Sequence, residues 1–214
     1  MPGSFHLKGR DLRINAPNEK GLAYDFMNLV LDDEYGLRRL RSRPQTILDV
    51  GANIGLFSMM AGALYPDAKI HAYEPNPRIQ KYLRPNLAQV NAKMFPEAVG
   101  AEAGTGDVCE SGDSRSGVFR KGGSIKITPL AEAVQRLGGA VDLLKLDCEG
   151  DEWDVFGDSL AFRGISSIRM EYHLVGGRTL GDLIAHARAV GFNLTKLEEN
   201  DGFGIAWLDQ SPLS

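Results

Sequence analysis

Residues Ile47-Leu-Asp-Val-Gly-Ala-Asn-Ile-Gly55 are the most informative stretch of the chain. The stretch begins as an apolar strand with an acid, Asp49, near its end, and then passes through a turn with two glycines into an apolar helix. A second apolar strand, Lys69–Glu74, follows the helix and also ends in an acid. Because both acids stand where parallel strands end, this order of elements predicts a pocket for a cofactor that contains adenosine.

The turn favours S-adenosylmethionine over a nicotinamide cofactor. The nicotinamide fingerprint, Gly-x-Gly-x-x-Gly, removes side chains from the backbone beside a pyrophosphate, whereas here Asn53 stands at the second glycine position. S-adenosylmethionine has no phosphate. Asp49 can accept from its ammonium, directly or through water, and the N–H groups of the turn and the helix N-terminus suit its carboxylate. Glu74 can accept from both ribose hydroxyls, and Pro75 restricts the backbone beside it. Without the two acids, such a turn would be an ordinary connection with no ligand.

The order of the predicted elements indicates an α/β fold. Strands are predicted at residues 46–50, 69–74, 93–99, 141–147 and 167–173, and helices at 55–65, 78–90, 130–137, 151–156 and 179–190. Pro85 is expected to interrupt or kink the second of these helices. Strands at 193–197 and 204–208 flank a Glu-Glu-Asn-Asp-Gly turn and form a hairpin. The pattern predicts a doubly wound, mostly parallel, seven-stranded sheet with a C-terminal antiparallel hairpin, the class I methyltransferase variant of the Rossmann fold.

The front of the chain differs from the alternating part. Residues 1–44 form a polar segment with one amphipathic helix, predicted at Tyr24–Leu40. We expect this segment to act as a helical cap or lid, and residues 45–214 to form the cofactor-binding methyltransferase domain. Residues 100–129 are rich in glycine and serine and contain only short β-like runs, at 107–110 and 124–127.

Composition limits the classes of function. The chain has 214 residues, of which 43% are hydrophobic and 24% charged, with a net charge of −4, so it predicts a globular protein without the basic face of a nucleic-acid binder. It lacks a signal-peptide pattern and an apolar run of the roughly 18–20 residues that span a membrane. Cys109 and Cys148 form no spaced framework and are expected to be reduced thiols. We therefore expect a cytoplasmic protein with no nucleic-acid or membrane partner, and leave a homodimer open.

Ionisable side chains gather at the ends of two later strands. Lys145, Asp147 and Glu149 share one face of the fourth strand, and Glu171 and His173 share one face of the fifth. If these strands are neighbours, their side chains meet at the rim of the sheet that the cofactor pocket occupies. Charged groups placed together in this way are costly unless water, a partner or a ligand meets them.

These side chains suit methyl transfer to a hydroxyl group. The acceptor must lose a proton, and histidine is the usual base near neutral pH, so His173 is the predicted base. A carboxylate on its other ring nitrogen would fix its tautomer, and Glu149 and Asp147 are predicted to take part in catalysis. Each residue has a structural alternative: His173 as a loop cap, Asp147 as an ion-pair partner of Lys145, and Glu149 as a helix N-terminal acid. His173 and carboxylates could hold a divalent metal, but no compact ligand motif is present, so no metal is predicted.

Four segments of the chain resemble the FkbM-type methyltransferases. They are Ile47–Gly55, Tyr73-Glu-Pro-Asn-Pro77, Glu97-Ala-Val-Gly100 and, most specifically, Val141-Asp-Leu-Leu-Lys-Leu-Asp-Cys-Glu-Gly-Asp-Glu152, which follows a Thr128-Pro-Leu helix start. The resemblance covers about residues 45–175. It implies S-adenosylmethionine as the cofactor and, commonly, O-methylation of small molecules or sugars.

The resemblance also implies roles for particular residues. Glu74 would hold the ribose, Glu97 and Ala98 would lie beside the adenine, and the front segment up to Tyr35 would be the acceptor-side lid. Together with the residues of the turn, the predicted cofactor-binding set is Asp49, Gly51, Ala52, Asn53, Gly55, Glu74, Pro75, Glu97, Ala98 and Asp147.

Several functions fit this sequence to different degrees. The leading hypothesis is an S-adenosylmethionine-dependent O-methyltransferase that acts on a small-molecule acceptor. A methyltransferase for RNA or protein is disfavoured by the net acidity, and a catalytically idle cofactor-binding protein by the intact acids and His173. A nicotinamide oxidoreductase is the least favoured, because of Asn53. The sequence does not determine the acceptor, the position methylated or the oligomeric state.

Overall fold

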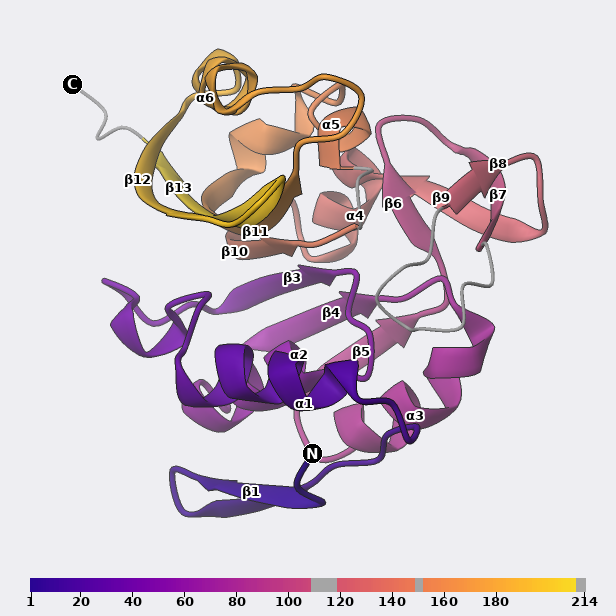
Figure 1. Cartoon of the computed structure of the whole chain (residues 1–214), viewed down its shortest axis with the longest axis vertical. Coiled ribbons are helices and arrows are strands. Elements are labelled where there is room, and N and C mark those ends of the chain that lie inside the picture. Colours follow the sequence, from indigo (N-terminus) through magenta and orange to yellow (C-terminus); the bar gives the residue numbers. More distant parts are fainter. Residues whose placement is uncertain (109–118, 149–151, 211–214) are drawn as a thin grey trace.

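The computed structural model describes residues 1–108, 119–148 and 152–210. At its centre lies a seven-stranded sheet with the strand order β12-β13-β11-β10-β3-β4-β5 (Figure 1). The strands are β3 (Thr46–Val50), β4 (Lys69–Tyr73), β5 (Ala92–Phe95), β10 (Val141–Leu146), β11 (Ile165–His173), β12 (Phe192–Glu199) and β13 (Phe203–Gln210). Strand β13 runs antiparallel to both of its neighbours, β11 and β12, and the other neighbouring pairs of this sheet are parallel. The predicted mostly parallel sheet with a C-terminal antiparallel hairpin is therefore confirmed.

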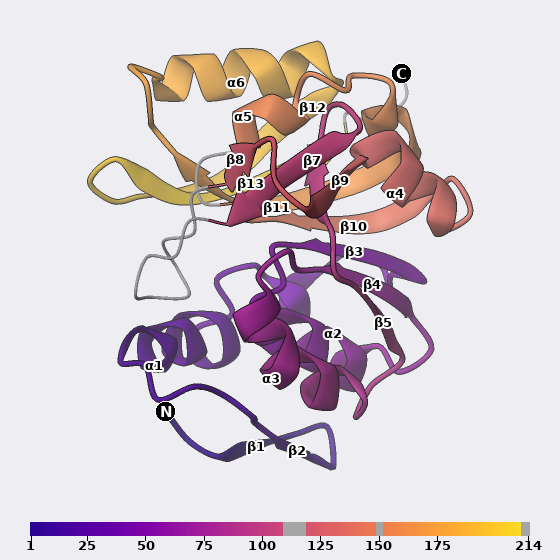
Figure 2. The ribbon, with the colours of Figure 1, turned by 90° about the vertical axis from the view of Figure 1, so that its right-hand side faces the viewer.

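Helices cover both faces of the sheet (Figure 2). On one face lie α1 (Gly21–Phe26), α2 (Leu56–Leu64) and α3 (Pro77–Leu87), and on the other lie α4 (Leu130–Arg136), α5 (Glu152–Val155) and α6 (Leu180–Ala189). Alternation along the strands explains this layering, because successive side chains point to opposite faces. In β3, Ile47 packs in the cluster that contains Phe57 of α2, whereas Leu48 packs in the cluster that contains Leu183 of α6. Both faces are apolar, as expected for a parallel sheet covered on both sides.

The front segment is where the predicted secondary structure is wrong. The helix expected at Tyr24–Leu40 is instead the short α1, a π-helical turn η1 (Met27–Leu31) and, after a bend, a 3-10 helix η2 (Leu37–Arg39). The chain bends at Asp33, whose φ is +56°, and the Asp33 carboxylate accepts the N–H of Arg38 at 3.1 Å. A side chain that bonds the backbone in this way offers an alternative to the helix. A hairpin of β1 (Ser4–Leu7) and β2 (Arg10–Arg13) precedes α1 and was not predicted.

Pro96 breaks a predicted strand, and Pro85 lies inside a helix that it was predicted to interrupt or kink. The strand expected at residues 93–99 is broken, because β5 ends at Phe95 and Pro96 has no N–H to continue the ladder. The chain then enters a separate four-stranded sheet of order β6-β9-β7-β8, formed by β6 (Ala98–Gly100), β7 (Gly104–Val108), β8 (Phe119–Lys121) and β9 (Ile125–Pro129). Pro85 does not interrupt α3, which continues to Leu87 and ends there. Cys109 and Glu110 lie outside the described residues.

The fold places the ends of the central strands β3, β4 and β10 side by side. Asp49 of β3 pairs in register with Lys145 of β10 and with Ala72 of β4. The carboxyl ends of parallel strands form the edge at which α/β sheets bind ligands. Among the described helices, none is both long and apolar enough to cross a membrane.

Candidate active site

The turn between β3 and α2 is tightly packed, which explains its glycines. Gly51 and Gly55 have φ values of +75° and +89°, in the left-handed region that favours glycine. A Cβ atom on Gly51 would lie 1.7 Å from the carbonyl oxygen of Asp147, and one on Gly55 would lie 2.7 Å from Cδ1 of Leu83. The two glycines therefore let the turn pack directly against the end of β10 and against α3.

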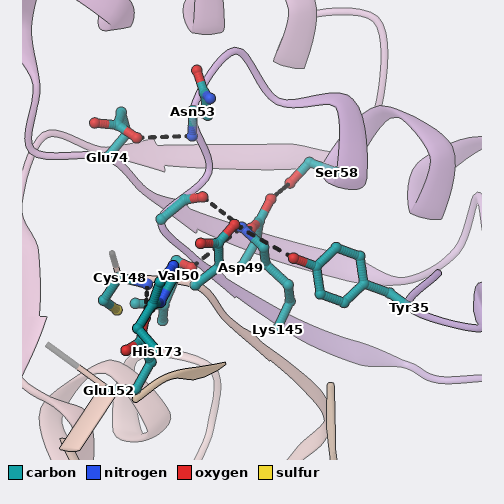
Figure 3. A network of polar contacts seen from close by, with 12 residues as sticks. Tyr35, Asp49, Val50, Asn53, Ser58, Glu74, Lys145, Cys148, Glu152 and His173 are labelled. Carbon is teal, nitrogen blue, oxygen red and sulfur yellow. Dashed lines mark hydrogen bonds and ion pairs between the residues drawn. The ribbon is translucent and has the colours of Figure 1, made fainter. Parts of the chain in front are cut away.

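Glu74 lies at the end of β4 and faces this turn. Its carboxylate is buried, and one oxygen accepts the N–H of Asn53 at 2.8 Å (Figure 3). The other oxygen accepts the N–H of Asn76, also at 2.8 Å. Burial raises the pKa of Glu74 to about 7, although the two N–H groups act in the opposite direction. The carbonyl oxygen of Pro75 accepts the side-chain amide of Gln80, which fixes the backbone next to Glu74.

Asp49 lies beneath the turn rather than in the pocket. Its carboxylate is fully buried, and Oδ2 accepts the hydroxyl of Ser58 at 2.6 Å. Lys145 is also buried, and its Nζ lies 3.6 Å from Oδ1 of Asp49 and donates to the carbonyl oxygen of Gly51 at 2.5 Å (Figure 3). The sequence suggested a direct or water-mediated contact between Asp49 and a ligand ammonium. A direct contact would require the side chains of Asp49 and Lys145 to move. Any effect of Asp49 on a ligand passes through Lys145 in this arrangement.

Asp147 connects the same lysine with the front segment. Its Oδ2 lies 3.1 Å from Nζ of Lys145 and accepts the hydroxyl of Tyr35 at 3.4 Å. Tyr35 is buried and packs edge-on against Phe57, with ring centroids 5.6 Å apart. Burial of Tyr35, together with the nearby charge of Asp147, raises the pKa of its phenol well above the ordinary value. Tyr35 is therefore a hydrogen-bond donor at neutral pH and is unsuited to act as a base.

A pocket of about 550 Å³ opens between the turn, the front segment and the ends of β10 and β11. The residues that line it come from α1, η1, the bend after η1, the start of α2 and these two strand ends: Leu22, Asp25, Asn28, Leu29, Glu34, Tyr35, Ala52, Asn53, Ile54, Leu56, Phe57, Lys145, Asp147 and Glu171. The pocket thus joins predicted cofactor residues, such as Asn53 and Asp147, to the segment predicted as a lid. Four carboxylic acids and one lysine make it strongly acidic.

His173 has the carboxylate partner that its predicted role requires, but the partner is Glu152. Nδ1 of His173 lies 3.3 Å from Oε1 of Glu152, a buried side chain that also accepts the N–H of Cys148 at 2.9 Å. The ring stacks on Phe203 and is not among the residues that line the pocket described above. Glu149, the other predicted catalytic acid, lies outside the described residues.

Glu97 forms ion pairs at the start of the second sheet. It accepts the hydroxyl of Thr128 and the guanidinium of Arg136, the latter at 2.7 Å, and these contacts outweigh its partial burial and lower its pKa. Ala98, the next residue, begins β6. A position of Glu97 and Ala98 beside the adenine stays a prediction.

The structure adds functional candidates that the sequence reasoning missed. Glu34 lies in the bend of the front segment, Ser58 on the first turn of α2, and Glu152 on α5. Glu152 belongs to the motif that starts at Val141, so its position was a usable signal, whereas Glu34 has no motif around it. Among the residues that the structure describes, no three His, Cys, Asp or Glu side chains are arranged to hold a metal ion.

Comparisons with known proteins bear on the family and the fold of the chain. The model of the methyltransferase FkbM domain matches residues 49–194. The methyltransferase sdnD of Sordaria araneosa is 39% identical over 84 residues, which cover 37% of this chain and 32% of sdnD. The chain therefore spans about a third of the length of that relative.

Solved structures show the same fold at low sequence identity. A putative RNA methyltransferase, PH1948 of Pyrococcus horikoshii, matches with a TM-score of 0.55 at 14% identity and covers 93% of this chain and 90% of its own. A precorrin-6y C5,15-methyltransferase of Geobacter metallireducens matches with a TM-score of 0.55 at 15% identity and covers 86% and 88% of the two chains. The names of these two proteins indicate different acceptors, so the shared fold does not identify the acceptor.

Proposed function

Because the chain belongs to the FkbM family of methyltransferases, for which S-adenosylmethionine is the methyl donor, we propose that it methylates a hydroxyl group of a small molecule or a sugar. The observation that supports this acceptor chemistry is the pair formed by His173 and the buried Glu152 at the end of β11. An attacking hydroxyl must lose its proton, and an imidazole oriented by a carboxylate is suited to accept it.

The residues of the turn fit the cofactor. Glu74 already accepts two backbone N–H groups, and its oxygens can accept further hydrogen bonds from the two ribose hydroxyls. Oδ1 of Asn53 is buried and has no hydrogen-bond donor within the described residues, so it is suited to a donor on the ligand. When bound, the cofactor supplies an electrophilic methyl group on its sulfonium.

Within the protein, each group has a separate task in the proposed reaction. Glu74 orients the ribose. Glu152 holds the Nδ1–H tautomer of His173, so that Nε2 is the nitrogen that accepts the proton of the acceptor. The front segment, with Tyr35 and Leu22 on its inner side, covers the pocket and excludes water. Positioning of the acceptor against the methyl group contributes the rest of the rate enhancement.

S-adenosylhomocysteine should bind with micromolar affinity, which corresponds to about −8 kcal/mol. NAD should not bind measurably, because Asn53 stands where a pyrophosphate needs a bare backbone. Isothermal titration calorimetry with both ligands tests this, and a preference for NAD would overturn the assignment of the cofactor.

Glu74→Ala should weaken the binding of S-adenosylhomocysteine by about 1.5–3 kcal/mol, the range for hydrogen bonds to charged groups. Part of the loss is expected to come from the turn, because Asn53 and Asn76 lose their acceptor. Calorimetry on the variant, with circular dichroism to confirm folding, provides the measurement. Glu132→Ala, at an exposed glutamate paired with Arg136 and Lys126, is the control and should leave the affinity unchanged. An unchanged dissociation constant for Glu74→Ala would exclude the ribose role.

The transfer of a labelled methyl group from S-adenosylmethionine to a panel of hydroxylated metabolites and sugars tests the proposed reaction. We expect labelled product from at least one member of the panel. Label that appears only in RNA or protein substrates would contradict the proposed acceptor class.

A further inference from the structure

Lys145 already occupies the acceptor groups that the turn could offer to an ammonium. Its Nζ donates to the carbonyl oxygen of Gly51 at 2.5 Å and lies 3.1 Å from Asp147 and 3.6 Å from Asp49. A lysine ammonium has three N–H donors. The carbonyl oxygens of Gly51 and Val50 and Oδ2 of Asp147 accept them, and Asp49 is an ion-pair partner at the longer distance. Burial alone would lower the pKa of Lys145. The carboxylates of Asp147 and Asp49 more than offset this effect and raise the pKa above its ordinary value, so the lysine stays charged. The ammonium of a bound cofactor must therefore find its acceptors elsewhere.

Asp147 has one oxygen available for such an ammonium. Its Oδ2 lies against Lys145 and Tyr35, whereas Oδ1 is covered and has no hydrogen-bond donor within the described part of the chain. A covered carboxylate oxygen without a donor is costly. Asp147 lines the pocket beside Asn53 of the turn, so a ligand held by that turn can reach it.

Glu34 lines the same pocket, and its backbone is fixed. Its carbonyl oxygen accepts the indole N–H of Trp207 at 2.8 Å, and its N–H donates to the carbonyl oxygen of Asn28 at 3.1 Å. The charged groups that act on its carboxyl come from several elements: Asp25 of α1, Lys145 of β10, Asp147 after β10 and Glu198 of β12. Glu171 of β11 also lines the pocket. Acids thus outnumber the one lysine, and that lysine is engaged elsewhere.

We propose that Asp147 and Glu34 together bind the ammonium group of the methionine part of S-adenosylmethionine. This inference rests on the proposed function and assigns one group of its cofactor. An ammonium between the two carboxylates donates to Oδ1 of Asp147 and offsets the repulsion between the acids. The sulfonium carries no N–H and cannot satisfy that oxygen. Lys145 is a positioning residue. It holds Asp147, and it takes the contacts with the carbonyl oxygen of Gly51 and with Asp49 that a ligand ammonium would otherwise make.

The proposal implies that cofactor binding releases a proton. Burial of Glu34, followed by the charge of Asp147, raises the pKa of its carboxyl to about 8, so at pH 7 most molecules hold this proton. A cation beside Glu34 lowers that pKa, so the proton leaves on binding. Affinity for a ligand with the ammonium should therefore rise with pH as Glu34 ionises, and level off above about 8.

The test compares S-adenosylhomocysteine with 5′-methylthioadenosine, which has the adenosine and sulfur but lacks the amino acid part. We define the ratio as the dissociation constant of 5′-methylthioadenosine divided by that of S-adenosylhomocysteine, so that it reports the contribution of the amino acid part alone. Titration of Glu74, whose pKa is about 7, affects both ligands and cancels in this ratio. In the wild type the ratio should rise about tenfold between pH 6.5 and 8. Asp147→Asn should reduce the ratio by about 10- to 100-fold at pH 8. Glu34→Gln should abolish its pH dependence and the proton release seen by calorimetry in buffers of different ionisation enthalpy.

Glu198→Gln is the matched control, because Glu198 influences Glu34 but does not line the pocket. It should keep a pH dependence of the same size, with the midpoint moved slightly to lower pH because one charge that raises the pKa of Glu34 is removed. A ratio that stays within about twofold of the wild type in both Asp147→Asn and Glu34→Gln would overturn the inference. If neither nucleoside binds to the wild type, the proposed function itself fails, which is a distinct result.

Discussion

Lys145→Met is expected to lower the free energy of unfolding by about 3–5 kcal/mol, the usual cost of removing one partner from a buried ion pair. Lys145 and Asp49 are both buried, and the substitution leaves the Asp49 carboxylate without its cation. The carbonyl oxygen of Gly51 also loses its donor. Urea unfolding, followed by circular dichroism, measures the difference between variant and wild type.

Lys126→Met provides a matched control for this stability measurement. Lys126 also lies near two carboxylates, those of Glu97 and Glu132, but its side chain is 52% exposed. Solvent screens such a pair, so its loss should cost at most about 1 kcal/mol. The double variant with Asp49→Asn should recover part of the stability lost in Lys145→Met, because the unpaired charge is removed. Equally small losses of unfolding free energy in Lys145→Met and Lys126→Met would show that the buried ion pairs of Lys145 do not stabilise the fold.

His173→Ala is expected to reduce the turnover number by about 10²–10⁴, the usual contribution of general acid–base catalysis. The affinity for S-adenosylhomocysteine should stay the same, since His173 and Glu152 lie outside the set of residues that line the described pocket. Transfer of a labelled methyl group to an acceptor found in the metabolite panel measures turnover. Glu152→Gln should reduce turnover less strongly, because the imidazole remains. The substitution changes the orientation of the ring and removes the negative charge that stabilises its protonated form.

His6→Ala controls for the loss of a histidine far from the site, since this side chain is 64% exposed. It should retain full turnover. If EDTA abolishes activity and magnesium restores it, His173 is better interpreted as a metal ligand. Near-full activity of His173→Ala with and without added metal would place the base elsewhere. Asp147 would then be the next candidate, because the raised pKa of Tyr35 makes the phenol unsuitable.

The central sheet could be predicted from the sequence because its strands are short apolar runs that end in charges or glycine. The strand at Thr46–Val50 was predicted to the residue, and those at Lys69–Tyr73 and Val141–Leu146 to within one. The front segment could not be predicted in this way. Its helical pattern is interrupted by Asp33, whose left-handed backbone depends on a hydrogen bond with Arg38 that forms only when the bend does. Local pattern does not show such a contact.

The candidate site shows the same division. The sequence correctly identified which acids stand at strand ends, but not which of them faces the pocket. Asp49 and Asp147 each precede a glycine by two or three residues in the sequence. In the structure Asp49 is fully buried against Ser58 and Lys145, whereas Asp147 lines the pocket. Glu34 could not be found, because its position depends on the packing of the front segment against β13, 173 residues away in sequence.

That long-range packing has a consequence for the order of biosynthesis. Trp207 of β13 holds the carbonyl oxygen of Glu34, and its ring lies so close to Gly36 that a Cβ atom there would be 2.4 Å from it. Arg39 stacks on the same ring, with its guanidinium carbon 5.0 Å from the ring centroid. During translation the front segment emerges well before β13, which carries its docking partner Trp207. A nascent chain on the ribosome therefore keeps an open pocket until β13 has emerged, and cofactor capture is expected only after that point.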